Sequence, residues 1–201
     1  DTVTSINDYV FFECTGLKTI HLPNNISLIS NNLFENCYNL TQIELPKSVT
    51  SINSCSFKNC QSLTSIEIPI NCTYIGYQCF HSCYSLTSMK IPENVGGIGE
   101  SSFENCYNLS SVYITNDLTS LSICVFRNCQ KLKDVHLPEK LNEIPRSTFE
   151  YNYALETIEI PNTVQYYRYY CFNSCTSLVN ITLPEIAYSI ESNSFSNLKS
   201  I

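Results

Sequence analysis

The chain has 201 residues, of which 11 are Lys or Arg and 18 are Asp or Glu, giving a net charge of −7. Because it carries no basic run, this charge argues against nucleic acid and anionic membrane surfaces as partners. No apolar stretch approaches the roughly 18 residues that a membrane span needs, so we expect no membrane insertion by this segment.

A phenylalanine that returns every 23 residues organises the whole chain. Its positions are Phe11, Phe34, Phe57, Phe80, Phe103, Phe126, Phe149, Phe172 and Phe195. A constant period of roughly 20–29 residues is typical of a solenoid, in which each repeat buries its apolar face against its neighbours. We therefore expect one elongated domain over residues 1–201, with about eight repeats. Both ends fall within partial repeats that lack a polar cap, so we expect a fragment of a longer protein.

Each repeat opens with the spacing Phe-x-x-Cys-x-x-Leu, as in Phe34, Cys37 and Leu40. A spacing of three residues favours a helical or 3₁₀ turn. Cysteine takes the middle place in seven repeats, whereas Asn152 and Leu198 take it in two others. Because a free thiol behaves as a small apolar group, we expect the cysteine column to be buried with the phenylalanines.

An aliphatic pair at spacing two follows each turn and predicts a short strand with one buried face. In chain order the pairs are Ile20/Leu22, Ile43/Leu45, Ile66/Ile68, Met89/Ile91, Val112/Ile114, Val135/Leu137, Ile158/Ile160 and Ile181/Leu183. Proline follows in all but one of these repeats and ends the strand, since it cannot donate a ladder hydrogen bond. A second apolar pair, such as Val49/Ile52, predicts a second extended stretch. Stacked coils then place the strands in a parallel sheet.

The repeat resembles the BspA-like (Treponema pallidum-type) leucine-rich repeat, and its pattern reads F-x-x-C-x-x-L-x-x-I-x-L-P-x-x-V-x-x-I over essentially residues 1–201. Segments such as 34–40 and 66–69 carry the likeness. The resemblance implies an α/β solenoid, coiled right-handed and curved, with a parallel β-sheet on its concave face. It also implies adhesion to, or recognition of, host or matrix proteins. The matching residues are structural, so no functional residue transfers with them.

The twelve cysteines are expected to be free thiols. Side chains of one column point the same way, which is poor geometry for a disulfide. One or two bridges are an alternative, since a secreted protein would favour a disulfide framework. A metal site is a further alternative, but the chain has no Cys-x-x-Cys pair and zinc needs four converging ligands. By their columns Cys55 and Cys124 lie nearest the surface, so they should react first with an alkylating reagent.

No residues are arranged for catalysis, so we expect neither enzyme activity nor a cofactor. His21 and His136 fall in one strand column five repeats apart, and His81 lies on the opposite side of the coil. The repeat places no nucleophile or carboxylate in a catalytic arrangement around any of the three. We expect surface histidines.

The outward side chains of the strand row are the predicted ligand-binding residues, because they vary in chemistry and lie outside the core. They are His21, Glu44, Glu67, Lys90, Tyr113, His136, Glu159 and Thr182. A plain solvated sheet face is the alternative interpretation of the same residues.

Residues 149–171 form the most irregular repeat, in which Tyr167 stands in an isoleucine column. The neighbouring Tyr166, Tyr169 and Tyr170 predict a contact patch, because tyrosine is favoured at binding hot spots. Self-association is one use of such a patch. The alternative is that Tyr167 fills a core position and the other tyrosines pack against it.

The sequence therefore predicts a non-catalytic protein-binding scaffold of a cell-surface or secreted protein, acting in adhesion or recognition. The alternative is an intracellular, cytoplasmic scaffold for protein–protein interactions, which the expected free thiols favour. No motif identifies the ligand.

Overall fold

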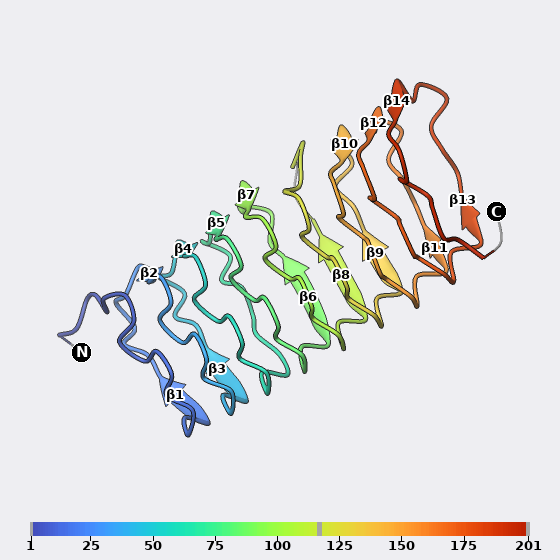
Figure 1. Ribbon diagram of the computed structural model, residues 1–201. Coiled ribbons are helices and arrows are strands. Elements are labelled where there is room, and N and C mark those ends of the chain that lie inside the picture. Colours follow the sequence, from blue (N-terminus) through green and yellow to red (C-terminus); the bar gives the residue numbers. More distant parts are fainter. Residues whose placement is uncertain (1, 116–117, 200–201) are drawn as a thin grey trace.

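The computed structural model describes residues 2–115 and 118–199, which form a solenoid of stacked coils (Figure 1). Each 23-residue repeat makes one coil, and the coils contribute short strands to two rows that run along the molecule. All strand pairs are parallel and join residues 23 positions apart, as in Ile20 with Ile43 and Val112 with Val135. The predicted parallel solenoid is confirmed.

The first row contains the strands predicted from the aliphatic pairs. They are β1 (Thr19–His21), β3 (Gln42–Glu44), β6 (Ser88–Ile91), β8 (Ser111–Ile114), β9 (Asp134–His136), β11 (Thr157–Ile158) and β13 (Asn180–Ile181). They pair as β1-β3, β6-β8-β9 and β11-β13. The strand predicted at Ile66 and Ile68 is absent, although both side chains are buried. A hydrogen bond from the Thr64 N–H to the Thr41 carbonyl (3.4 Å) joins this coil to its neighbour, but its first-row residues pair with neither adjacent strand.

The second row is built from the predicted extended stretches, which form two-residue strands. They are β2 (Leu28–Ile29), β4 (Ser51–Ile52), β5 (Tyr74–Ile75), β7 (Gly97–Ile98), β10 (Glu143–Ile144), β12 (Tyr166–Tyr167) and β14 (Ser189–Ile190). They pair as β2-β4-β5-β7 and β10-β12-β14. The second residue of each interior strand is buried, an isoleucine in every case except Tyr167 of β12, so this row closes the core on a second side.

The phenylalanine column fills the third side of the coil. Its rings stack in sequence with centroid distances between 5.3 and 5.9 Å. The seven rings from Phe34 to Phe172 are completely buried, whereas the end rings Phe11 and Phe195 are half-buried because each has one neighbouring coil. The core is therefore a continuous strip rather than a ball.

The Phe-x-x-Cys-x-x-Leu segment is a chain of turns, and no helix occurs within residues 2–115 and 118–199. The Cys37 N–H donates to the Phe34 carbonyl at 3.1 Å, as a 3₁₀ turn would require. The next turn cannot continue as a helix because Asn36 has a left-handed φ of 63°. The α part of the predicted α/β class is therefore not confirmed.

Left-handed residues recur at two fixed places, two positions before and two positions after each phenylalanine. After the phenylalanine, five of nine coils have asparagine, which tolerates this conformation better than most residues. These residues also join the coils: the Asn36 N–H donates to the Lys58 carbonyl at 2.9 Å, and the Asn32 N–H donates to the Ser54 carbonyl at 3.0 Å. Backbone geometry at these turns therefore explains why asparagine recurs two residues after the phenylalanine.

The column cysteines hydrogen-bond from coil to coil. The Cys60 thiol donates to the Phe34 carbonyl, and the Cys106 thiol to the Phe80 carbonyl, each at 3.2 Å. In the irregular coil the Asn152 amide donates to the Phe126 carbonyl at 3.0 Å, so it replaces the thiol in the same role.

All twelve cysteines are unbridged, and nine of them are buried. Cys55 and Cys124, predicted to be the most accessible, are half-buried. The prediction that all column cysteines are buried is wrong for Cys14, which is exposed because it lies in the outermost coil and has one neighbour. Burial raises the pKa of the Cys106 thiol to about 12.

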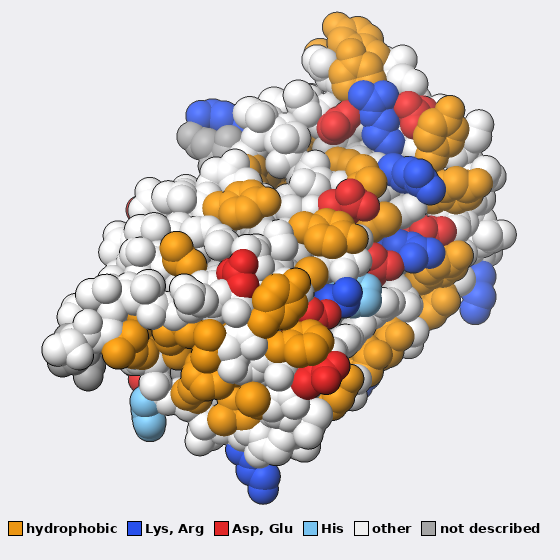
Figure 2. All heavy atoms as spheres, turned by 60° about the vertical axis from the view of Figure 1, so that its left-hand side comes forward, with side chains coloured by type: hydrophobic (Ala, Val, Ile, Leu, Met, Phe, Trp, Pro, Cys, Tyr) orange, Lys and Arg blue, Asp and Glu red, His pale blue; other side chains and the backbone are white. Residues whose placement is uncertain are grey.

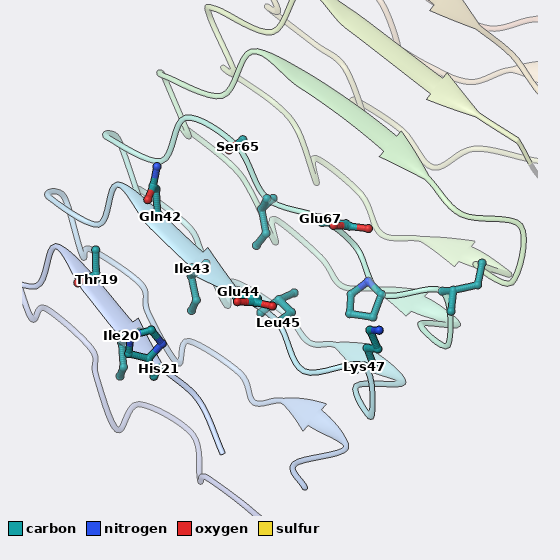
Figure 3. A pocket seen from close by; sticks show the side chains of 13 residues that line it. Thr19, Ile20, His21, Gln42, Ile43, Glu44, Leu45, Lys47, Ser65 and Glu67 are labelled. Carbon is teal, nitrogen blue, oxygen red and sulfur yellow. The ribbon is translucent and has the colours of Figure 1, made fainter. Parts of the chain in front are cut away.

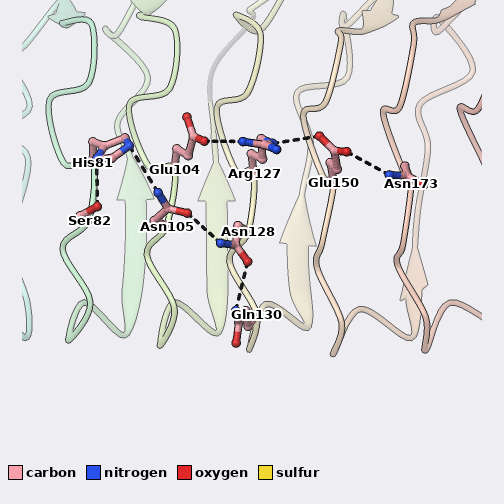
Figure 4. Close-up of polar contacts among 9 residues, drawn as sticks. All are labelled: His81, Ser82, Glu104, Asn105, Arg127, Asn128, Gln130, Glu150 and Asn173. Carbon is pink, nitrogen blue, oxygen red and sulfur yellow. Dashed lines mark hydrogen bonds and ion pairs between the residues drawn. The ribbon is translucent and has the colours of Figure 1, made fainter. Parts of the chain in front are cut away.

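A row of polar side chains crosses the turns of neighbouring coils (Figure 4). Arg127 donates to Glu104 at 2.9 Å and to Glu150 at 2.8 Å, and Asn173 donates to the second oxygen of Glu150 at 2.9 Å. Arg127 also lies 5.3 Å from the centre of the Tyr151 ring. Burial alone raises the pKa of the Glu150 carboxyl, but hydrogen bonds from Asn173 and Arg127 outweigh it and hold that pKa below its ordinary value.

Under native conditions we expect iodoacetamide to modify Cys14 first, Cys55 and Cys124 more slowly, and the nine buried thiols only after unfolding. Only the thiolate is nucleophilic, and burial both blocks the reagent and keeps the thiol protonated. Peptide mass spectrometry over a time course measures the order. Modification of Cys106 as fast as Cys14 would contradict this account.

Replacing Glu150 by Gln should lower the free energy of unfolding at neutral pH by about 1–3 kcal/mol, because a buried charge-assisted hydrogen bond is lost. The folded pKa of Glu150 lies below the unfolded one, so its contribution is present above about pH 4.3 and disappears as the pH falls through the folded pKa. The difference from the wild type should therefore shrink toward about pH 3 in denaturant titrations.

The matched control is Glu156→Gln, which breaks the exposed pair with Lys133 (3.5 Å) and should change stability by less than about 1 kcal/mol. A Glu150→Gln deficit that stays constant down to acidic pH would show that the carboxylate charge is not what stabilises the coil.

Candidate functional site

The first-row face is the surface formed by the outward side chains of the first strand row. All eight predicted residues are exposed on it: His21, Glu44, Glu67, Lys90, Tyr113, His136, Glu159 and Thr182. Strand pairing fixes the spacing of part of this row: His21 lies beside Glu44, and Tyr113 lies beside both Lys90 and His136. The structure therefore brings these residues together in one continuous strip of varied polar chemistry.

Two adjoining hollows lie on this face over the coils that begin the chain, and Figure 3 shows the side chains that line the first of them. Their volumes are ≈ 730 and ≈ 490 Å³, and both are lined by Ser65, Ile66, Glu67 and Ile70. This shared boundary is the coil whose first-row residues pair with neither neighbour. The unpaired coil of the first row thus lies between these two hollows.

Ile70 is the most informative residue at this boundary, and the sequence analysis missed it. Its side chain is 52% exposed. The described equivalents in other coils are all polar: Asn24, Lys47, Glu93, Glu139, Asn162 and Glu185. Comparing the residues at this position of each repeat would have identified Ile70 as an apolar residue at a position that is otherwise polar. An exposed aliphatic side chain between two hollows offers a partner about 1.5–3 kcal/mol if fully buried.

A third hollow, of ≈ 500 Å³, lies between β9 and β11, which do not pair with each other. Asp134, Glu139 and Glu159 line it together with His136. The His136 ring stacks on Tyr113 with a centroid distance of 4.5 Å and an interplanar angle of 18°. This half of the first-row face is therefore acidic and carries an aromatic pair.

The tyrosines of residues 149–171 divide between core and surface. Tyr167 is completely buried, so it fills a core position as one interpretation predicted. Tyr169 and Tyr170 are 49% and 38% exposed, and Tyr166 is half-buried beneath Arg168, whose guanidinium lies 4.8 Å from its ring centre. Figure 2 shows hydrophobic side chains, tyrosines included, lying beside acidic and basic ones along one side of the molecule.

Tyr170 occupies one of the left-handed positions, with φ 61°. The equivalent residues in the interior coils are smaller or more flexible, such as Gln78, Ser101 and Ser147. A bulky residue at positive φ is uncommon, and strained residues cluster at functional sites. The first coil also has a tyrosine at this position, Tyr9, with φ 62°.

The histidines do not form a site together. His81 lies on the turn side, where its ring nitrogens contact Ser82 at 3.0 Å and Asn105 at 3.4 Å. His21 and His136 lie on the first-row face, in different hollows. Within residues 2–115 and 118–199 no group of three or more His, Cys, Asp or Glu side chains could hold a metal ion. In the same residues no helix is long and apolar enough to cross a membrane.

Solved structures with the same fold come from several bacteria. A leucine-rich repeat protein from Bacteroides ovatus is 32% identical, with a TM-score of 0.85 over 91% of this chain and 47% of that one. The T. pallidum leucine-rich repeat protein is 30% identical, with a TM-score of 0.70 over 76% of this chain and 72% of its own. A leucine-rich cell surface protein from Faecalibacterium prausnitzii is 27% identical, with a TM-score of 0.60 over 98% and 62%.

The chain thus spans about half the length of the Bacteroides ovatus protein (47%). No curated protein matches it. The family described as "BspA type Leucine rich repeat region" matches in six copies, over residues 1–110 and 96–201. With the repeat, the solenoid and these matches in agreement, the chain belongs to the BspA-type leucine-rich-repeat family.

Proposed function

We propose that this chain is a non-catalytic scaffold that binds a protein ligand in adhesion or recognition, as part of a cell-surface or secreted protein. The single observation that carries the proposal is the first-row face, a continuous exposed strip with hollows and an exposed Ile70 between two of them. The eight outward residues of the strip form the proposed binding surface.

Binding on this face would work by complementarity rather than by capture in a closed pocket. The strand backbone is paired from β1 to β3 and from β6 to β9, so the outward side chains of those coils are already in place before a ligand arrives. Ile70 would anchor an apolar side chain of the ligand, while neighbouring carboxylates and Lys47 would set its orientation.

The location at the cell surface rests on the relatives. The Faecalibacterium prausnitzii protein is described as a leucine-rich cell surface protein, and it aligns with 98% of this chain. A specific observation supports the alternative, an intracellular scaffold: all twelve cysteines are unbridged, which suits a reducing compartment.

The proposal is tested with a panel of purified extracellular-matrix and serum proteins, using immobilised wild-type protein and surface plasmon resonance. We expect at least one of them to bind. Replacing Ile70 by Asp should weaken that binding at least tenfold, or about 1.4 kcal/mol, because an apolar anchor is replaced by a charge that resists desolvation.

The matched control is Ile123→Asp, which alters an isoleucine that is 37% exposed but lies outside the first-row face. This variant should bind like the wild type. Equal losses in the two variants, or binding that survives both, would reject the first-row face as the site. Binding confined to proteins from the cytosol of the producing cell would favour the intracellular alternative.

We further propose that Tyr166, Tyr169 and Tyr170 form a second contact patch, used for a partner or for self-association. The exposed Tyr169 ring and the left-handed Tyr170 support this, because the fold needs neither ring. Two arginine contacts, to Glu143 at 2.8 Å and to Glu191 at 3.0 Å, hold Arg168 over Tyr166 and would keep the patch rigid.

Replacing Tyr169 and Tyr170 by Ser should change the free energy of unfolding by less than about 1 kcal/mol, since exposed side chains contribute little to stability. Self-association or ligand binding should weaken in the same variant. Thermal unfolding and analytical sedimentation measure the two effects. A loss of several kcal/mol with unchanged association would mean that the tyrosines serve packing.

A further inference from the structure

The ends of the first-row face differ in charge. Over the first coils acidic and basic side chains are mixed, with Glu44, Glu67 and Glu93 against Lys47 and Lys90. The lining of the third hollow is more acidic. It contains three carboxylates, Asp134, Glu139 and Glu159, and one basic residue, Lys133. Lys133 lies 3.5 Å from Glu156, so its charge is already offset.

The aromatic pair at this end has the geometry of a stacking platform. Tyr113 and His136 are directly paired residues of β8 and β9, and their rings lie 4.5 Å apart and within 18° of parallel. Tyr113 is 41% exposed and has Lys90 as its paired neighbour on the other side, so an incoming group reaches the stack at its solvent edge or from the side of His136. His136 also lines the hollow that contains the three carboxylates.

A flat aromatic surface beside several carboxylates favours one kind of side chain. The guanidinium of arginine is planar, stacks on aromatic rings and donates paired hydrogen bonds to carboxylates. A lysine ammonium is a compact point charge that gains the electrostatic attraction but not the stacking or the bidentate geometry. A carboxylate or phosphate on the partner would be repelled here.

We infer that the acidic half of the first-row face binds an arginine-bearing, basic segment of a protein partner, with a guanidinium stacked at Tyr113 and His136 and paired with Asp134 or Glu159. This inference rests on the proposed function and adds the chemistry of the ligand. It also gives the ligand a direction: its apolar anchor lies at Ile70 and its basic segment toward β9 and β11. The chain's net charge of −7 would speed the encounter with such a partner.

The test uses a direct probe, so it does not depend on finding the natural ligand. Fluorescence anisotropy is measured with three labelled peptides that alternate serine with arginine, lysine or citrulline. At about 50 mM salt the arginine peptide should bind at least fivefold more tightly than the lysine peptide, and the uncharged citrulline peptide should bind weakest.

Two variants locate the site. The double variant Asp134→Asn/Glu159→Gln should weaken binding of the arginine peptide at least tenfold, while its control, Glu13→Gln/Glu100→Gln, which makes the same charge change elsewhere on the surface, should weaken it less than about threefold. Tyr113→Ser should abolish the preference for arginine over lysine, whereas Tyr77→Ser, at a site 44% exposed off this face, should preserve it.

Equal weakening by the site and control pairs would mean general attraction to an acidic protein and would overturn the inference. So would an arginine preference that survives Tyr113→Ser. Suppose that the peptides give one of these results while Ile70→Asp still abolishes binding of a matrix protein. The first-row face would then remain the binding surface, and the inference of an arginine-bearing partner would be rejected. If instead the arginine peptide binds as expected and Ile70→Asp leaves binding of a matrix protein unchanged, the Ile70 anchor is rejected and the arginine site is kept.

Discussion

The structure depends on one constraint: every coil has the same length, so each side chain meets its equivalent from the next coil. Phenylalanine rings stack at 5.3–5.9 Å, and column thiols donate to carbonyls 26 residues earlier. Asparagine amides reach back in the same way, as Asn108 does to the Tyr84 carbonyl at 2.7 Å. A coil one residue longer would displace all of these contacts together, because none of them can be satisfied within a single coil.

The same constraint separates structure from binding. Buried columns hold side chains that pack against their equivalents in the next coil, and the phenylalanine column is invariant along the chain, although other buried columns admit changes such as Asn152 and Tyr167. The outward column of the first row meets only solvent and lateral neighbours, so it can change from Glu to Lys to Tyr without disturbing the core. The same freedom permits both the exposed Ile70 and the Tyr113–His136 stack. Chemical variety is therefore concentrated where a ligand can reach it.

The period and the polarity pattern predicted most of this fold: parallel strands, a buried phenylalanine strip and an exposed outward column. They failed at the turns, because a spacing of three residues fits a helix as well as a chain of turns. The left-handed φ of residues such as Asn36, which prevents a helix, cannot be seen in the spacing. They also failed at Ile66, whose apolar pattern matches that of the paired coils although its backbone pairs with neither neighbour. The hollows and the stacked rings depend on how side chains from neighbouring coils are oriented. The sequence of the repeats does not specify those orientations.

The most direct test of the central constraint compares two deletions that differ by one residue. Removing 81–103 takes out one whole coil and joins Phe80 to Glu104, so every column stays in register. Removing 81–102 leaves one extra residue in the joined coil. Circular dichroism and denaturant unfolding should show a folded, cooperative protein for the first deletion and a severely destabilised one for the second. Equal stability of the two variants would contradict the claim that coil length holds the structure together.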